Sequence, residues 1–172
     1  GSGTVLDTAR LRFQLGEKLK VDNRSVHAFI IGEHGDSEMA AWSSANISGV
    51  PLQTFCDMRG QFDHDENTET IETSVKNSAY EIIRKKHATY FGIAMVVKRI
   101  CQAIVRDEKS IFPVSHRLHG EYGIEDVVLS MPAIVGAYGM ESPIPISLDE
   151  KEIAKLRESA EILKEIAGQI DI

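Results

Sequence analysis

The sequence predicts an α+β fold in which antiparallel strands pack with long helices. The apolar run Phe29–Ile31 stops abruptly at a glycine, as expected for a buried strand that ends in a tight turn. Apolar residues recur at helical spacing in several long segments. Short apolar segments between residues 110 and 138 are separated by glycine and proline, which is typical of strands joined by turns. With 172 residues, the chain is long enough to bury one core, so a single domain is expected.

The first part of the chain is predicted to alternate between helix and strand. Leu6, Ala9 and Phe13 follow the spacing of a helix near the N-terminus. Residues 25–31 then form a strand with polar flanks. Residues 41–48 lead to a turn at Gly49-Val50-Pro51.

The middle of the chain is predicted to be helical, with one interruption. The acidic segment 63–66 opens the helical stretch, because acidic side chains favour a helix N-terminus. The helix breaks or bends near His87. The apolar positions of the two helical parts are Ile71, Val75, Ala79, Ile82, Ile93, Val96, Val97, Ile100 and Ile104.

The last part of the chain is predicted to contain short strands and a closing helix. The strands are 110–113, 127–131 and 134–138, with turns at Gly120, Gly123, Pro132 and Gly139. Ser147 and Glu150 have the spacing of a capping box. The apolar stripe of the closing helix is predicted to pack on the core and consists of Ile153, Leu156, Ala160, Leu163, Ala167 and Ile170.

Composition narrows the classes of function. The net charge of -7 argues against a nucleic-acid surface, which requires basic residues. No apolar run approaches the roughly 20 residues needed to cross a bilayer, and no signal peptide opens the chain. Cys56 and Cys101 are predicted to be buried apolar positions, not a disulfide. This cysteine usage is typical of a reducing cytoplasm.

His34 is the first candidate for chemistry. It follows the predicted strand 29–31 between two glycines, Gly32 and Gly35, which allow close approach to the backbone. An imidazole titrates near neutral pH, so it can both give and take a proton. The alternative is a loop histidine that is hydrogen-bonded to a neighbouring carboxylate.

Asp7 and Arg10 are the second candidates, and they share a face of the first helix. They are either an exposed ion pair of little energetic value or parts of a site. In a site, the carboxylate would orient an imidazole and stabilise its charged form. The guanidinium would grip a substrate carboxylate through two parallel hydrogen bonds, which a lysine cannot do.

Two groups of residues suggest a metal site and are rejected as metal ligands. Residues 63–66 are acidic and include a histidine, but a solvated loop is the better interpretation. His116 and His119 have no third ligand nearby in the sequence. No metal is therefore expected.

The chain resembles the NAD-dependent L-lactate dehydrogenases, especially those of bacteria. The resemblance spans the whole chain, and its most specific motifs lie at residues 1–12, 32–38 and 86–94. Weaker matches follow at 120–124, 129–136 and the closing helix. The family's fold implies that this is only the C-terminal, substrate-binding half, spanning residues 1–172. The N-terminal Rossmann domain is absent, because no glycine-rich dinucleotide turn occurs.

The resemblance implies a role for each candidate residue. His34 exchanges a proton with pyruvate or L-lactate, Asp7 holds the imidazole and Arg10 clamps the substrate carboxylate. Thr89 lies beside the substrate and Ile93 packs against the nicotinamide ring. Thr89 and Ile93 are expected one helical turn apart, and His87 stands where a glycine is common. NAD is bound mainly by the missing domain, so this chain alone is expected to be inactive.

The resemblance also implies regulation. In allosteric bacterial members of the family, residues at the positions of Arg12 and His27 bind fructose 1,6-bisphosphate across a twofold interface between subunits. The intact enzyme is then expected to be a cytoplasmic homotetramer of glycolysis and fermentation. An exposed helix arginine and an ordinary strand histidine are the alternative interpretation of these two positions.

Two other functions stay open at this stage. The first keeps the enzyme class but changes the substrate, as in a malate or other 2-hydroxy acid dehydrogenase fragment. The chain would otherwise be a non-catalytic module for oligomerisation or effector binding, in which Asp7 and His34 have no chemical task.

Overall fold

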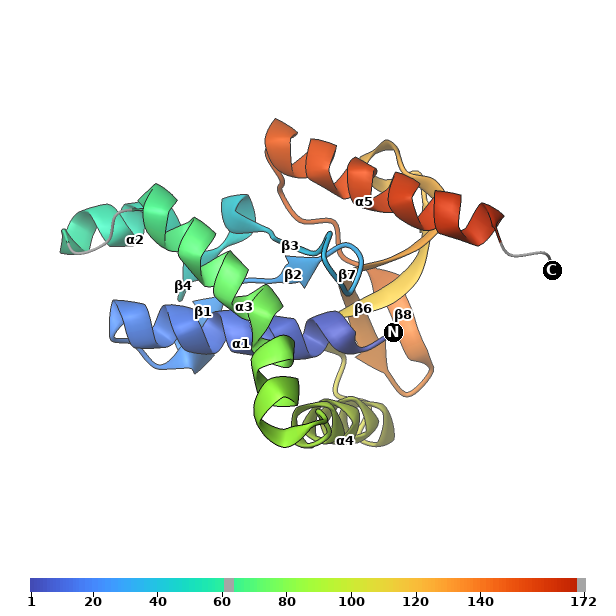
Figure 1. Cartoon of the computed structure of the whole chain (residues 1–172), viewed down its shortest axis with the longest axis horizontal. Helices are drawn as coiled ribbons and strands as arrows, with labels where there is room; N and C mark the ends of the chain where they lie inside the picture. The colour runs from blue at the N-terminus through green and yellow to red at the C-terminus, as the bar shows by residue number, and fades with distance from the viewer. Residues whose placement is uncertain (61–63, 170–172) are drawn as a thin grey trace.

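Helices pack against antiparallel strands in the computed structural model of the chain (Figure 1). Clusters of buried apolar side chains hold these elements together. The structure describes residues 1–60 and 64–169, with the side chains of 64–66 left aside. The predicted α+β class is confirmed. Helix α1, Gly3–Leu19, runs through the middle of the molecule and contributes to two of the clusters.

Short strands follow α1. They are β1 (Val26–His27), β2 (Ile30–Ile31), β3 (Met39–Ala40), β4 (Asn46–Ile47) and β5 (Val50–Pro51), before helix α2 (Leu52–Arg59).

The predicted strand 25–31 is wrong as one element. It is divided into β1 and β2, because β1 pairs with β4 whereas β2 pairs with β3. The predicted turn also lies earlier than expected. Ser48 and Gly49 adopt positive φ angles of 49° and 89°, and β5 already pairs back onto β4.

Helices α3, His64–Lys86, and α4, Phe91–Val105, confirm the predicted interruption. His87 has a φ of 63°, a left-handed conformation that ends α3 and that glycine adopts most readily. The prediction that Thr89 and Ile93 lie on one helix is therefore wrong. Thr89 lies in the connection 88–90, because α4 starts only at Phe91.

The largest sheet consists of β6 (Ser110–His119), β7 (Glu125–Gly136) and β8 (Gly139–Pro143), in that order. The predicted turn at Pro132 is wrong, because β7 runs through it. Pro132 faces Pro113 on β6, and neither ring nitrogen carries a hydrogen to share across this pair. Their carbonyl groups instead accept from Ile144 N and Thr4 Oγ1.

Helix α5, Glu150–Gly168, crosses one end of the β6–β7–β8 sheet (Figure 1). Its capping box is made by Asp149 and Glu152, not by the predicted Ser147 and Glu150. The apolar stripe is buried at Leu156 and Ala160, whereas Ala167 is exposed and residue 170 lies outside the described part. No helix in the described residues has the length and apolar character to cross a membrane.

The two cysteines differ in environment. Cys56 is buried in α2, as predicted, and burial raises the pKa of its thiol. Cys101 is exposed on α4, so the prediction that it is buried is wrong. The helix presents Cys101 on the face turned away from the cluster that contains Val96.

Candidate active site

Helix α1 directs Asp7 and Arg10 to one side of the molecule. Asp7 is buried, with a side chain only 3% exposed, and Arg10 Nη1 donates to its Oδ1 at 3.0 Å. The Arg10 side chain is 16% exposed. This pair is therefore not the solvated surface ion pair that sequence spacing alone allows, since its carboxylate is removed from water.

The loop between β2 and β3 holds His34 and is anchored on two other elements. Gly32 exchanges two backbone hydrogen bonds of 2.9 Å with Ser130 on β7. On α5, Ser159 Oγ accepts from Glu33 N at 3.1 Å and lies 3.0 Å from Ser37 Oγ. The loop that presents the histidine is thus fixed by segments far away in sequence.

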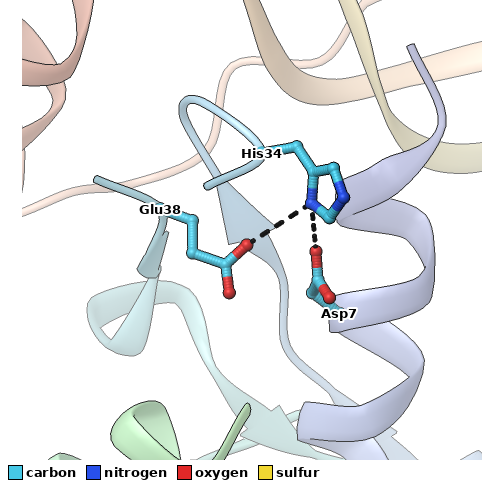
Figure 2. Close-up of side chains that lie close together, drawn as sticks. All are labelled: Asp7, His34 and Glu38. Atoms are coloured by element: carbon cyan, nitrogen blue, oxygen red, sulfur yellow. Dashed lines mark ion pairs between the residues drawn. The ribbon is translucent and has the colours of Figure 1, made fainter. Parts of the chain in front are cut away.

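His34 meets Asp7 and a second carboxylate, Glu38, through the same ring nitrogen (Figure 2). Its Nδ1 lies 2.8 Å from Asp7 Oδ2 and 3.7 Å from Glu38 Oε2. The Asp7 oxygen is buried without a hydrogen-bond partner of good geometry among the described residues, so the imidazole is its nearest counter-charge. The other ring nitrogen is turned away from both acids (Figure 2).

The two carboxylates favour the charged imidazole. Asp7 first, and then Glu38, raise the pKa of His34 to about 10. Burial raises the pKa of Glu38 to about 7. A histidine that is half exposed and positively charged can donate a proton to a group that approaches from solvent.

Arg10 lies between two adjoining cavities. One, of about 240 Å³, is lined by Arg10, Asp7 and His34 together with Lys76 and Tyr80 of α3. The other, of about 180 Å³, is lined by Arg10 and the start of α4.

The second cavity contains both of the remaining residues predicted for substrate and cofactor, Thr89 and Ile93. They therefore lie near Arg10, although they do not share a helix. Tyr90 and Phe91 add aromatic surface to this cavity, which makes it suitable for a flat ring.

Arg12 and His27 lie away from the His34 cavity. Arg12 Nε donates to Ala28 O at 3.1 Å, and its guanidinium stacks over the Phe29 ring. Burial lowers the pKa of Arg12. Arg12 also lines a third cavity, of about 450 Å³, together with Arg24 and Arg99. His27 is exposed on β1 and is not part of this cavity.

Asp7, His34 and Glu38 are also the one group in the described part of the chain with the spacing of metal ligands, within 4.8 Å of one another. The Arg10 cation on Asp7 opposes a metal ion there. His116 is buried and His119 exposed, without forming such a group among the described residues. The acidic segment 63–66 lies outside the described side chains. That no metal is bound stays a prediction.

Two residues of the site were missed by sequence reasoning, namely Glu38 and Gly3. Glu38 is one of three acidic residues close to His34, and nothing in the sequence separates it from the others. Gly3 begins α1 directly beneath the imidazole. A Cβ atom there would lie 2.1 Å from Cγ and Cδ2 of His34, so only a glycine leaves room for the ring.

We expect Gly3→Ala to lower the pKa of His34 towards its ordinary value, because the added methyl group pushes the ring away from Asp7. Gly3 is the first residue of α1 and alanine is a good helix former, so unfolding is not the expected result. NMR titration of selectively labelled histidine measures the pKa. Gly168→Ala in α5 is the matched control, since a Cβ there meets no atom within 4 Å. An unchanged His34 titration in Gly3→Ala would contradict this packing role.

Comparison with known proteins agrees with this geometry. Residues 4–170 match the family described as lactate/malate dehydrogenase, alpha/beta C-terminal domain. The whole chain is 54% identical to part of an L-lactate dehydrogenase of Acetivibrio thermocellus, of which it covers 54%. It is 46% identical to that of Thermoanaerobacter pseudethanolicus and covers 55% of it.

Solved structures give the same result. The minor L-lactate dehydrogenase of Enterococcus mundtii, in its ligands-bound form, superposes with a TM-score of 0.94 at 41% identity. That match covers 100% of this chain and 55% of the Enterococcus chain. The present chain therefore spans about half the length of the relatives it matches.

Proposed function

The chain belongs to the lactate/malate dehydrogenase family, and on that basis we propose that it is the substrate-binding domain of an L-lactate dehydrogenase. The proposed reaction interconverts pyruvate and L-lactate. The observation that supports it best is the convergence of Asp7, Arg10 and His34 at one cavity, from two segments of the chain. These are the three groups that a 2-oxo acid requires: an anion clamp, a proton donor and an acid that orients the donor.

Each proposed role belongs to a residue that lines one of the two cavities. Arg10 lines both cavities, where it binds the pyruvate carboxylate through two hydrogen bonds. The outward nitrogen of protonated His34 donates to the ketone oxygen. In the reverse direction, neutral His34 removes the hydroxyl proton of lactate. Asp7 fixes the ring and stabilises its positive charge.

The cofactor proposed for this reaction is NAD, and the residues at the start of α4 fit part of it. Ile93 and Phe91 offer apolar surface beside Arg10 and Thr89, as a nicotinamide ring needs. When bound, NADH supplies the hydride. Ile93 positions the ring and helps to exclude water from the reacting atoms, and Thr89 lines the substrate side of the cavity.

We further propose that the chain works only together with a nucleotide-binding domain of the complete protein. Helix α4 exposes several large apolar side chains, among them Phe91 at 68%, Met95 at 61% and Val97 at 49%. Exposed apolar surface of this kind usually marks an interface. The isolated chain is expected to be inactive, and the complete protein is proposed to act in the cytoplasm, in glycolysis and fermentation.

The test is an assay of the complete gene product with NADH and a series of 2-oxo acids. Turnover with pyruvate well above that with oxaloacetate supports the proposal. A preference for oxaloacetate would identify a malate dehydrogenase. Absence of NADH oxidation with every 2-oxo acid would favour a non-catalytic module.

An effector site is proposed at Arg12 and His27, for fructose 1,6-bisphosphate acting in a homotetramer. The supporting observation is the arginine-lined cavity beside Arg12, since guanidinium groups bind phosphate in two-pronged contacts. Symmetry would bring equivalent cationic sites together across a twofold interface.

Arg12→Gln is expected to abolish activation of the complete enzyme by fructose 1,6-bisphosphate, because the neutral amide removes a phosphate ligand. The measurement is the KM for pyruvate with and without the bisphosphate. Arg117→Gln is the control for the loss of one positive charge, because Arg117 of β6 forms an exposed ion pair with Asp126 of β7. Activation that persists in both Arg12→Gln and His27→Gln would refute this site.

A further inference from the structure

Glu38 is a buried acid that the proposed mechanism does not yet use. The residue is only 3% exposed, where β3 begins after the His34 loop. Its backbone N–H donates to Gly35 O at 3.1 Å, which closes the turn that follows His34. A buried carboxylate is costly unless a charge or hydrogen bond compensates it. Among the described residues, the cation that forms an ion pair with Glu38 is His34, at 3.7 Å.

Glu38 and Asp7 form a pair of buried like charges on one side of the ring (Figure 2). Both carboxylates approach Nδ1, and the three groups lie within 4.8 Å of one another. Arg10 neutralises the far oxygen of Asp7 but makes no ion pair with Glu38. The imidazolium is therefore the shared counter-charge of two acids, and Glu38 depends on it more than Asp7 does.

We propose that Glu38 is a positioning residue that acts with Asp7 to orient the His34 imidazole and to strengthen its hold on a proton. The role of the imidazole in turnover rests on the proposed function, whereas the contact between Glu38 and His34 does not. Asp7 fixes the ring from α1. Glu38 fixes it from the strand side, so the two acids together restrict rotation of a side chain that is otherwise 56% exposed.

The charged groups around Glu38 and His34 determine whether removal of Glu38 raises or lowers the pKa of His34. The titratable and charged groups that line the cavities on either side of Glu38 are Asp7, Arg10, His34, Asp36, Glu72, Lys76, Tyr80, Lys155 and Glu158. Of these acids, Asp7 is the one that shares an ion pair to His34 with Glu38 among the described residues. Burial raises the pKa of Glu38 to about 7, so Glu38 is ionised at alkaline pH, where His34 loses its proton. Removing Glu38 must then lower the pKa of His34.

The experiment compares Glu38→Gln with the unaltered complete protein. In the pH profile of kcat/KM for pyruvate reduction, the fall on the alkaline side (the alkaline limb) is expected to move to lower pH by about 1 unit. This shift is the lower end of the effect of an opposite charge at this distance. The acid limb of lactate oxidation is expected to move in the same direction by the same amount, because both limbs report the titration of His34. Lower rates without any movement of either limb would indicate a merely structural role and overturn the proposal.

Two matched variants complete the design. Glu33→Gln removes the same charge from the same loop. Because the Glu33 carboxylate accepts a hydrogen bond from Ser37 and has no ion pair to His34 among the described residues, this variant should leave both limbs of the pH profiles in place. Glu38→Met removes the charge without introducing a buried amide, and it should reproduce the shift if Glu38→Gln fails to fold. An equal shift in Glu33→Gln would show a general charge effect and contradict the assignment to Glu38.

NMR titration of labelled His34 without substrate gives a second readout that does not depend on turnover. A lowered His34 pKa in Glu38→Gln supports the proposal even in a protein that fails to reduce pyruvate, and in that case only the proposed function is refuted. An active enzyme in which neither the limbs nor the His34 titration respond would refute the inference and leave the proposed function standing.

Discussion

His34→Asn in the complete protein is expected to lower kcat for pyruvate reduction by about 100- to 10,000-fold, the range that a positioned general acid contributes. Asparagine keeps a polar group of similar size near Asp7 but has no proton to give at any working pH. Steady-state kinetics with NADH and pyruvate measure the loss. Titration of NADH fluorescence is expected to show that cofactor binding survives.

His119→Asn is the control for this variant, because His119 is an exposed histidine at the end of β6, far from the described cavities. Its kcat is expected to match that of the unaltered protein. Unchanged turnover in His34→Asn would rule out His34 as the proton donor, and parallel loss of NADH binding would point to a damaged fold.

Arg10→Lys is expected to raise the KM for pyruvate and to lower kcat/KM by about 10- to 150-fold, equal to one lost charge-assisted hydrogen bond of about 1.5–3 kcal/mol. Lysine keeps the positive charge but lacks the planar pair of donors. The single ammonium group of a lysine would also be shared between the substrate and Asp7, to which Arg10 Nη1 donates at 3.0 Å. Initial rates over a range of pyruvate concentrations separate the two constants.

The matched control is Arg84→Lys, an exposed arginine of α3 whose nearest acid is Glu81 at 3.8 Å. It is expected to leave both constants unaltered. A normal response to pyruvate in Arg10→Lys would exclude a two-pronged clamp at this position.

The core of the site was predictable from sequence because its residues lie in short motifs. Asp7 and Arg10 share a helical face by spacing alone, and His34 stands in a glycine-bounded turn after an apolar run. The structure confirms that these three residues lie together. It also places Thr89 and Ile93 in one cavity with Arg10, although the predicted helical relation between them is wrong.

Local fold errors share one cause, which is that strand pairing is a long-range choice. The local sequence around Pro132 predicts a turn, yet Pro132 lies inside β7. Its partner across the sheet is Pro113, and neither proline has an N–H group to donate to the other. The local sequence of segment 25–31 predicts one strand, but its first part pairs with β4 and its last part with β3. Neither outcome follows from local propensity or from apolar periodicity.

The sequence by itself determined the α+β class and the helix break at His87, since residue type and short spacing are local properties. Together with the family resemblance, it also proposed which residues act as proton donor, orienting acid and anion clamp. Only the tertiary structure decided that Glu38 is buried against the same ring nitrogen as Asp7, that Gly3 leaves room for the imidazole, and that Ser159 of α5 anchors its loop. The physical reason is that burial and contact between distant segments depend on how the whole chain packs, and such packing changes the charge state of a residue without changing its surroundings in the sequence.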